Sequence, residues 1–406
     1  MGDGAPPSGA AEEGGDTVPA PDRSAGLDER ARAVLDAHWR PPTGDGTGGY
    51  TVPSASVYPF QWLWDSCFHA LVWAHLGDGE RAVTELAHLF RTQSPSGFVP
   101  HVDYEHAPVH HAEFWGREGH SSITQPPMFG HALAELHRRG IDVERLVEPA
   151  RRGLTFLLRE RPRVDGLVAM LHPWESGGDD CPRWDDWCPG GWDPTRWYDV
   201  KGALVRSLRF SDDASPVGNT DFEVGAASFN GLIAFNAFEL AGVTADHELA
   251  AMADALVEAL DARWDPSVGT WVDAGPSEEG SGRVRTLDAL LPVLVSRRTD
   301  AVDVAFAQIV DDRAFGGACG PAQVHRHEPS FAPRTYWRGP AWPQLSYLAW
   351  VAARRHGHSA TATAIARSLV AGAVASGWAE YWDADDGTGL GAAPQSWATV
   401  ATLVGG

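Results

Sequence analysis

Apolar residues recur at helical spacing through most of this 406-residue chain. Leu27, Ala31 and Leu35 share one helix face, so ordered structure is expected to begin near Leu27. Segments such as 68–76 and 232–240 are apolar nearly all round, which is typical of helices buried on most sides. The pattern predicts further helices over 60–77, 80–93, 125–139, 143–160, 196–209, 222–241, 244–263, 285–296, 299–311, 341–356, 358–376 and 393–404.

Strand signals are scarce, and 269–272 is the clearest of them. A long, continuous series of helices predicts an all-α toroid of helical hairpins, in which an outer ring covers an inner ring. No change of composition divides the chain beyond residue 26, so 26–406 is expected to form one domain. Residues 1–25 are rich in Gly, Ala, Pro, Ser and acidic residues, and a disordered tail is expected there.

Charge and cysteine usage narrow the classes of partner. The net charge of −22 argues against nucleic acids and anionic membranes, which bind clusters of basic residues. The sequence shows neither a leader segment nor a long apolar run, so a cytoplasmic protein is expected. Free thiols are favoured for the four cysteines, although Cys181 and Cys188 are close enough in sequence to bridge. The only lysine, Lys201, is interpreted as compositional bias, and nothing indicates an oligomeric state.

Four connections are long and rich in aromatic and charged residues, namely 94–124, 162–195, 265–284 and 312–340. Connections of this length are usually functional or unstructured, and their Trp, His and Arg content favours function. In a helical toroid, long loops at one end would build a funnel over the axis. The chain also contains 18 Trp, which favours a carbohydrate ligand over a nucleotide.

The segment 172–188 combines acids with indoles in a stretch that cannot form a regular helix. Gly177, Gly178 and Pro182 interrupt it. Aromatic faces stack on the C–H face of a sugar ring, and carboxylates bind hydroxyl groups or move protons. A small sugar is therefore the expected ligand. The acids are Glu175, Asp179, Asp180, Asp185 and Asp186, and the indoles are Trp174, Trp184 and Trp187.

Two other segments place an acid among aromatic residues. Asp65 follows Gln61, Trp62 and Trp64, which indicates a ligand pocket as well as an acid in a helix's first turn. Glu380 lies within the aromatic run 378–382 and is the candidate for a second carboxylate; the alternative is an acid on a surface turn.

Histidines and a glutamine complete the polar candidates. His101, His106, His110 and His111 show no recognised ligand spacing, so neither a metal nor a cofactor is expected. Of these, His101 is the best pocket candidate. Gln125 precedes two prolines, and it either faces the pocket or caps a helix.

Four blocks of the chain resemble signature blocks of bacterial glycoside hydrolase family 63. They are YPFQWLWDSCF at 58–68, ESGGDDCPRWD at 175–185, YWRGPAWP at 336–343 and EYWDADDGTG at 380–389. They occur in the family's order and are specific when taken together. The mannosylglycerate and glucosylglycerate hydrolases are the subgroup that the blocks resemble most.

The resemblance implies an (α/α)6 toroid and an inverting hydrolysis of an α-glycosidic bond. It implies that Asp179 is the general acid and Glu380 the general base. In the family, Asn usually follows the catalytic Asp, whereas Asp180 stands here, so either the pKa of Asp179 is raised or the pocket differs. The implied substrate-binding residues are Tyr58, Phe60, Gln61, Trp62, Trp64, Asp65, His101, Gln125, Trp174, Glu175, Gly177, Tyr336, Trp337, Arg338, Gly339, Trp342, Tyr381, Gln395 and Trp397.

Other activities remain open at this point. One alternative is a different α-glucosidase on the same toroid, such as a trehalase-like or oligosaccharide-trimming enzyme. Sugar 2-epimerases share the toroid but use paired histidines, and the carboxylate-bearing blocks argue against them. A non-catalytic sugar-binding protein is the alternative from another class, and retention of both carboxylates argues against it.

Overall fold

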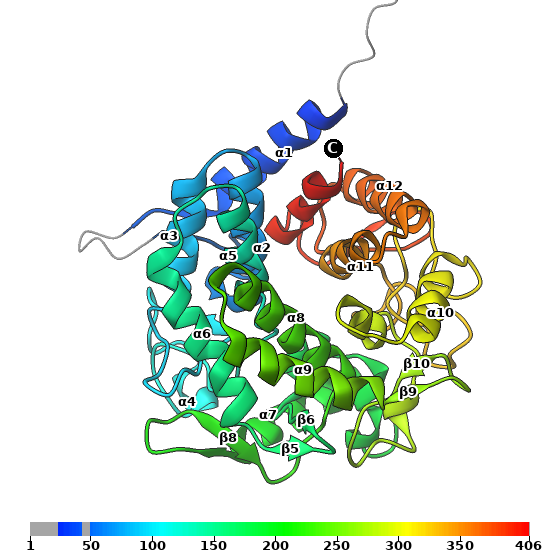
Figure 1. The fold of residues 1–406 in the computed structure, drawn as a ribbon, viewed down its shortest axis with the longest axis horizontal. Coiled ribbons are helices and arrows are strands. Elements are labelled where there is room, and N and C mark those ends of the chain that lie inside the picture. Colours follow the sequence, from blue (N-terminus) through cyan, green and yellow to red (C-terminus); the bar gives the residue numbers. More distant parts are fainter. Residues whose placement is uncertain (1–22, 43–48, 406) are drawn as a thin grey trace, which may run out of the picture.

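Two concentric rings of helices form the protein in the computed structural model, which describes residues 23–42 and 49–405 (Figure 1). Each inner helix contacts the next, and the last closes on the first. This is the predicted (α/α)6 toroid. The inner ring consists of α2 (Leu63–His75), α5 (Phe129–Arg138), α8 (Ala227–Thr244), η4 (Asp288–Leu294), α11 (Pro343–Arg355) and η5 (Ser396–Val404).

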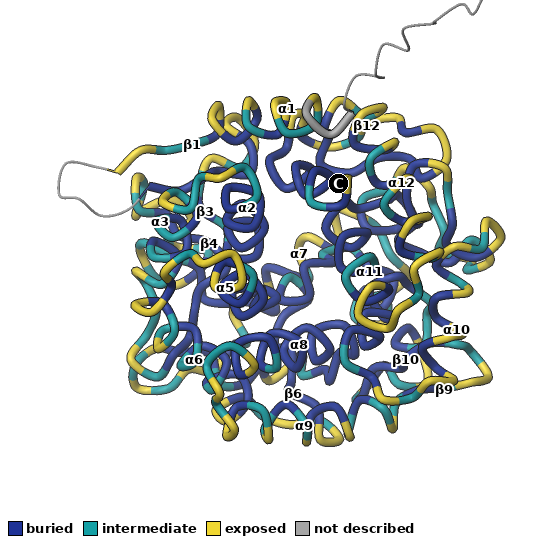
Figure 2. The backbone as a smooth tube through the Cα atoms, turned by 45° about the horizontal axis from the view of Figure 1, so that its top comes forward, coloured by how far each residue is buried: buried dark blue, intermediate teal, exposed yellow. Residues whose placement is uncertain are grey.

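The outer ring covers the inner one, and each outer helix packs on an inner neighbour. Nearly every residue of α2 and α8 is buried, because an inner helix has neighbours on both sides and behind it (Figure 2). The outer ring consists of α1 (Arg23–His38), α3 (Gly79–Leu89), α6 (Glu144–Arg159), α9 (His247–Asp261), α10 (Thr299–Val310) and α12 (Ser359–Ala375).

Each predicted helix has a counterpart in the structure, with bounds that shift by a few residues and two differences in type. The segments predicted over 285–296 and 393–404 contain the 3₁₀-helices η4 and η5. Pro292 lies inside η4 and cannot donate the backbone hydrogen bond that an α-helix needs there. Helix α1 begins at Arg23, inside the predicted tail 1–25, whereas residues 1–22 lie outside the described part.

The strands in the described part form two-stranded antiparallel ribbons in the connections. The ribbon of β9 and β10 confirms the strand expected at 269–272. The pairs are β1 (Trp39–Arg40) with β2 (Tyr50–Thr51), β3 (Gln61–Trp62) with β4 (Val102–Asp103), β5 (Arg163–Val164) with β6 (Leu167–Val168), β7 (Leu208–Phe210) with β8 (Pro216–Asn219), β9 (Trp264–Asp265) with β10 (Thr270–Trp271), and β11 (Tyr381–Trp382) with β12 (Gly389–Leu390).

The long connections meet at the end where the inner helices begin. Isolated β-bridges join Met170 to Val224, Gly225 to Ala274 and Ala341 to Trp382. Val224 and Ala341 lie shortly before α8 and α11, and Trp382 lies in the connection that leads to η5. The connections also contain short helices, namely α4 (Ala112–Trp115), η1 (Pro173–Ser176), η2 (Pro182–Trp187), α7 (Pro194–Arg206) and η3 (Ser281–Arg283).

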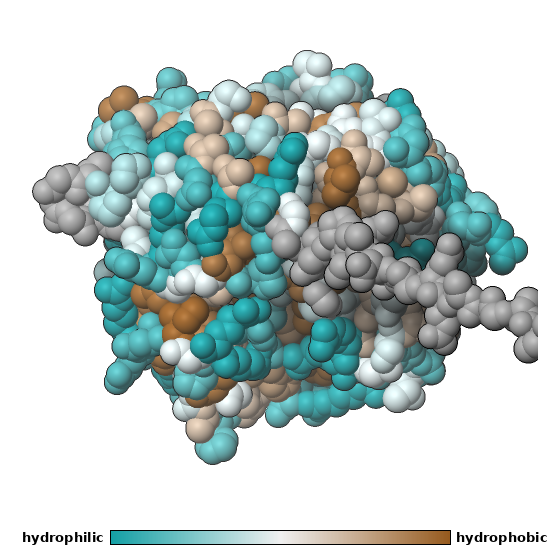
Figure 3. Space-filling view, turned by 90° about the horizontal axis from the view of Figure 1, so that it is seen from above, coloured by the Kyte–Doolittle hydropathy of each residue, from teal (hydrophilic) through white to brown (hydrophobic). Residues whose placement is uncertain are grey.

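The surface is largely polar. On the face that carries α1, hydrophilic side chains surround small groups of apolar ones (Figure 3). Within 23–42 and 49–405, no helix has both the length and the apolar character needed to cross a membrane. All four cysteines are buried and unpaired, so the free thiols favoured by the sequence are confirmed.

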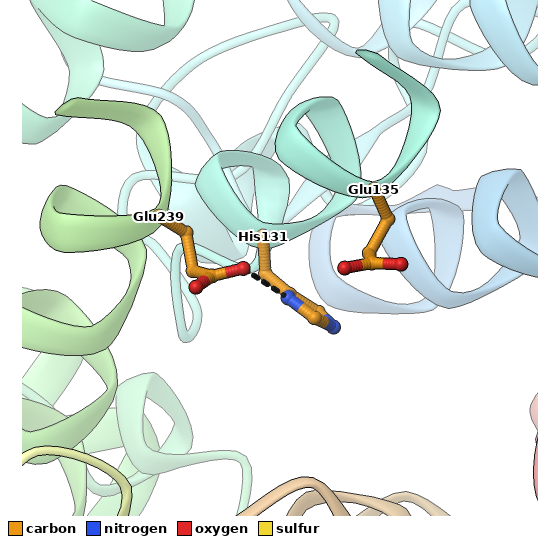
Figure 4. Close-up of side chains that lie close together, drawn as sticks. All are labelled: His131, Glu135 and Glu239. Atoms are coloured by element: carbon orange, nitrogen blue, oxygen red, sulfur yellow. Dashed lines mark hydrogen bonds and ion pairs between the residues drawn. The ribbon is translucent and has the colours of Figure 1, made fainter. Parts of the chain in front are cut away.

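A buried carboxylate ties three inner helices together near the ends at which they terminate. Glu239 of α8 accepts hydrogen bonds from Arg138 of α5 at 2.7 Å and from Arg355 of α11 at 2.5 Å. His131 Nδ1 lies 3.1 Å from Oε2 of Glu239, and the two side chains point toward one another (Figure 4). Burial opposes ionisation of Glu239, but the hydrogen bonds from His131 and Arg138 outweigh it and lower its pKa.

The cluster around Glu239 is an ion-pair network rather than a metal-binding site. His131, Glu135 and Glu239 present ligand atoms within 4.8 Å of one another. However, both oxygens of Glu239 already bind arginine, so a metal ion there would lie close to two guanidinium groups.

Glu239→Gln is expected to lower the free energy of unfolding by about 2–4 kcal/mol at neutral pH, because it leaves two arginines without their buried partner. The exposed Glu258→Gln on α9 is the matched control and should change it by less than about 0.5 kcal/mol. Urea unfolding measures both.

The pKa of Glu239 is lower in the folded chain than in the unfolded one. Its stabilisation is therefore complete above the unfolded pKa and declines as the pH falls, and the deficit of the variant should shrink in acid.

Candidate active site

A cavity of about 630 Å³ opens at the end of the toroid where the long connections meet. Its wall contains eight residues that the sequence predicted, namely Tyr58, Phe60, Trp62, His101, Gln125, Trp174, Asp179 and Tyr336. A larger hollow of about 1250 Å³ lies between α1, α11 and α12, but among the described residues that line it none is Asp or Glu. The smaller cavity is therefore the candidate active site.

Asp179 is the carboxyl group on the cavity wall. Its Oδ2 accepts a hydrogen bond from the Tyr336 hydroxyl at 3.2 Å. Burial raises the pKa of Asp179 to about 7, and the charges of Asp180 and Glu380 add to the rise, whereas Lys201 and Tyr336 oppose it. A carboxylic acid with this pKa still holds its proton near neutral pH, as a general acid must.

Glu380 precedes β11 and is held from several sides. Its Oε1 accepts from the Tyr58 hydroxyl at 3.1 Å, and its Oε2 accepts from the Ala392 amide at 3.0 Å. Its carbonyl oxygen accepts from the Trp397 indole at 2.9 Å. Burial raises the pKa of Glu380, and the hydrogen bonds from Ala392 and Tyr58 limit the rise by stabilising the ionised form.

The two carboxyl groups share one aromatic environment although they are far apart in the sequence. Tyr58 and Tyr336 both line the cavity, and each donates to one of the two acids. Burial, reinforced by the neighbouring carboxylates, raises the pKa of both phenols, so both remain hydrogen-bond donors. The Glu380 charge also contributes to the raised pKa of Asp179. Glu380 itself is not among the described residues that line the cavity and reaches its wall through the hydrogen bond from Tyr58.

Asp65 is a third buried acid and lies in the first turn of α2. Burial raises its pKa to about 7; His69 and Gln395 oppose the rise, and the Glu380 charge adds to it. The neighbouring Trp64 packs edge-on against Trp397 at 5.7 Å between ring centroids.

Glu175 supports the loop and is not available to a sugar. Arg161 donates to it twice, at 2.9 and 2.7 Å, and both side chains are fully buried. The backbone amides of Thr124 and Leu171 supply two further hydrogen bonds, at 3.1 and 2.8 Å. Because four donors saturate the carboxylate, the expected sugar contact is corrected to a structural role.

Arg338 also has a structural role where a sugar contact was expected. It donates twice to Asp185, at 2.8 and 2.7 Å, and once to the carbonyl oxygen of Asp180 at 3.2 Å. Arg183 is fully buried against Asp273, with 2.9 Å from Nε to Oδ2. These pairs tie the segment 172–188 to other loops.

Gln61 points away from the cavity. Its amide nitrogen donates to the carbonyl oxygen of Glu85 at 3.1 Å, and its amide oxygen lies 2.6 Å from His88 Nδ1. Successive residues of a strand face opposite sides, so Trp62 faces the cavity when Gln61 faces α3. The expectation that Gln61 holds the sugar is therefore wrong.

Gly177 lets the loop approach an indole closely. It has a φ of +75°, and a side-chain carbon there would lie 2.5 Å from Trp64. The predicted residues behind the cavity wall are buried: Trp337 and Trp342 stack at 3.6 Å, and Trp342 stacks on Tyr381 at 4.5 Å. Gly339 packs against Ala332 and Pro333. The Gln395 side-chain oxygen accepts a hydrogen bond from the Trp397 amide at 3.0 Å.

Several cavity residues escaped the sequence interpretation. Lys201 lines the cavity, and its uniqueness in the chain was the signal that could have identified it. Tyr198 also lines the cavity and lies on the predicted helix 196–209. The others come from connections whose structure was not predicted: Ser56, Val57, Pro59, Tyr104, His110, His111, Phe114 and Trp115.

Comparisons with known proteins point to one family. The family described as "Mannosylglycerate hydrolase MGH1-like glycoside hydrolase domain" matches residues 58–398. The mannosylglycerate hydrolase of Thermus thermophilus is 28% identical over 414 residues, which cover 88% of this chain and 96% of the relative. The glucosylglycerate hydrolase of Mycolicibacterium hassiacum is 28% identical over 437 residues, which cover 89% of this chain and 94% of the relative.

The solved structures agree. A crystal structure of the GH63 mannosylglycerate hydrolase from Thermus thermophilus in complex with Tris matches with a TM-score of 0.80 at 26% identity. The match covers 93% of this chain and 99% of that chain. The resemblance carried by the four sequence blocks is thus confirmed over most of the chain.

Glu175→Gln tests the structural role of this residue. The substitution leaves the buried Arg161 without a charge partner and is expected to lower the free energy of unfolding by about 3–5 kcal/mol. Urea unfolding measures the change, and the exposed Glu279→Gln is the control. Unchanged stability together with a raised KM would instead show that Glu175 contacts the sugar.

Proposed function

Because the chain belongs to the mannosylglycerate hydrolase MGH1-like glycoside hydrolases, we propose that it hydrolyses the α-glycosidic bond of a small hexosylglycerate, such as mannosylglycerate or glucosylglycerate. The protein is a glycoside hydrolase. The observation that carries the proposal is the pair of acids, the half-buried Asp179 and the buried Glu380, each hydrogen-bonded to a tyrosine of one aromatic cavity.

The proposed mechanism is a single displacement with inversion. Asp179 donates its proton to the glycosidic oxygen as the bond between that oxygen and the anomeric carbon breaks. Glu380 accepts a proton from the water that forms the new bond on the opposite face of the sugar. The raised pKa of Asp179 suits the first role, and the hydrogen bonds that stabilise ionised Glu380 suit the second.

The cavity wall supports a sugar ligand of limited size. Its volume of about 630 Å³ lies within the range of pockets that bind one small molecule. Trp62, Trp174 and Tyr336 offer aromatic surfaces for the faces of a hexose ring. The substrate carboxylate adds a negative charge to a cavity in which Lys201 is the only lysine or arginine among the lining residues.

A substrate panel with detection of the released anomer tests the activity. Glucosylglycerate, mannosylglycerate and trehalose are each incubated with the enzyme and followed by proton NMR before mutarotation. A hexosylglycerate is expected to be cleaved fastest and to release the β-hexose first. Release of the α-anomer would refute inversion, and faster cleavage of trehalose would favour the trehalase-like alternative.

Asp179→Asn and Glu380→Gln separate the two catalytic roles. Each is expected to lower kcat on a hexosylglycerate by about 10²–10⁴-fold while substrate binding persists. An α-glycosyl fluoride needs no protonation of its leaving group, so it should restore turnover to Asp179→Asn but not to Glu380→Gln.

In the unsubstituted enzyme, kcat/KM should decline above about pH 7 as Asp179 loses its proton. Activity close to that of the unsubstituted enzyme in either variant would refute its role.

A further inference from the structure

The only lysine of the chain lies beside the proposed general acid. Lys201 of α7 is 6% exposed, and its Nζ lies 2.6 Å from Oδ1 of Asp180, the residue after Asp179. The ammonium group is 5.3 Å from the ring centroid of Trp174 and 5.7 Å from that of Trp197. One carboxylate and two indoles therefore hold the charge in a defined place.

Helix α7 also holds the backbone on both sides of this ion pair. The Trp197 indole donates to the carbonyl oxygen of Asp179 at 3.0 Å. On the other side, His172 Nε2 lies 3.0 Å from the carbonyl oxygen of Lys201. Three contacts thus join α7 to the segment that carries Asp179, and the ion pair is the charged one among them.

We propose that Asp180 and Lys201 form a charge-compensated pair that positions Asp179 and keeps its proton available for catalysis near neutral pH. Lys201 is then a positioning residue that acts through Asp180, not a proton donor. The inference rests on the proposed function, in which Asp179 is the general acid.

The reason is that the two charges act on Asp179 in opposite directions. The Asp180 carboxylate raises the pKa of Asp179, and the Lys201 ammonium lowers it. With both present, burial remains the main influence and the acid keeps its proton. If either Asp180 or Lys201 loses its charge, the charge of the other shifts the pKa of Asp179 without compensation, in a site where charges are poorly screened.

The other groups that face Asp179 do not provide this compensation. Tyr336 donates to it from the 331–341 connection, and Glu380 adds a negative charge from the start of β11. The phenol of Tyr58 faces both acids. Arg338 contacts the Asp180 carbonyl, but its charge is paired with Asp185. Lys201 is therefore the cation that balances Asp180.

A double-mutant cycle on pH profiles tests the pair, with Asp180→Asn, Lys201→Met and the double variant. The measurement is the alkaline limb of kcat/KM. Lys201→Met should move this limb to higher pH, and Asp180→Asn should move it to lower pH, each by about 1–3 pH units. The double variant should return to within about 0.5 unit of the unsubstituted enzyme. Lys201→Arg keeps the charge and should shift the limb little, and the exposed Asp199→Asn on α7 is the control for charge removal.

Shifts of the same sign in both single variants, or losses of kcat that add in the double variant without any shift, would overturn the proposal. A second readout does not depend on a substrate. Lysine labelled with ¹⁵N gives one side-chain signal, since the chain has a single lysine. That signal should move with Asp180→Asn and when Asp179 titrates, but not with Asp199→Asn. Failure to hydrolyse any hexosylglycerate would refute the proposed function, whereas a lysine signal indifferent to Asp179 and Asp180 would refute the pair.

Discussion

Burying a carboxylate is costly unless a cation or several hydrogen bonds compensate its charge. At the active-site end of the toroid, some of the described carboxylates have a cationic partner and others do not. Around the segment 172–188, arginine or lysine pairs with four acids: Arg161 with Glu175, Arg183 with Asp273, Arg338 with Asp185 and Lys201 with Asp180. Across the described residues, Asp65, Asp179 and Glu380 form no ion pair with any basic side chain. Burial raises the pKa of all three acids, and the proposed mechanism uses two of them, Asp179 and Glu380.

The toroid makes this selection possible because it brings distant connections to one place. The inner helices begin at the same end, and isolated bridges join the segments that precede them. Asp179 and Glu380 come from different connections, and Tyr336 and Tyr58 come from two more. At the other end, the Glu239 network joins α5, α8 and α11, so the ring is fastened where no chemistry is needed.

The division between supporting and reacting residues accounts for where the sequence interpretation failed. Glu175, Gln61 and Arg338 lie in the sequence blocks that resemble the family, yet the side chain of each is hydrogen-bonded to other residues of the protein. Lys201 lies outside those blocks and is read from the sequence as bias, but it lines the cavity. In each case the partner comes from a segment distant in sequence, which periodicity and composition do not reveal.

By itself, the sequence determined the helices, the toroid and the family, because apolar spacing and signature blocks are properties of contiguous residues. The β9 and β10 ribbon was also foreseeable from 269–272. Only the tertiary structure decided which acid has a cation, which polar side chain faces the cavity and which glycine lies against an indole. Those properties depend on what is packed opposite each residue, and packing joins residues that are far apart in the chain.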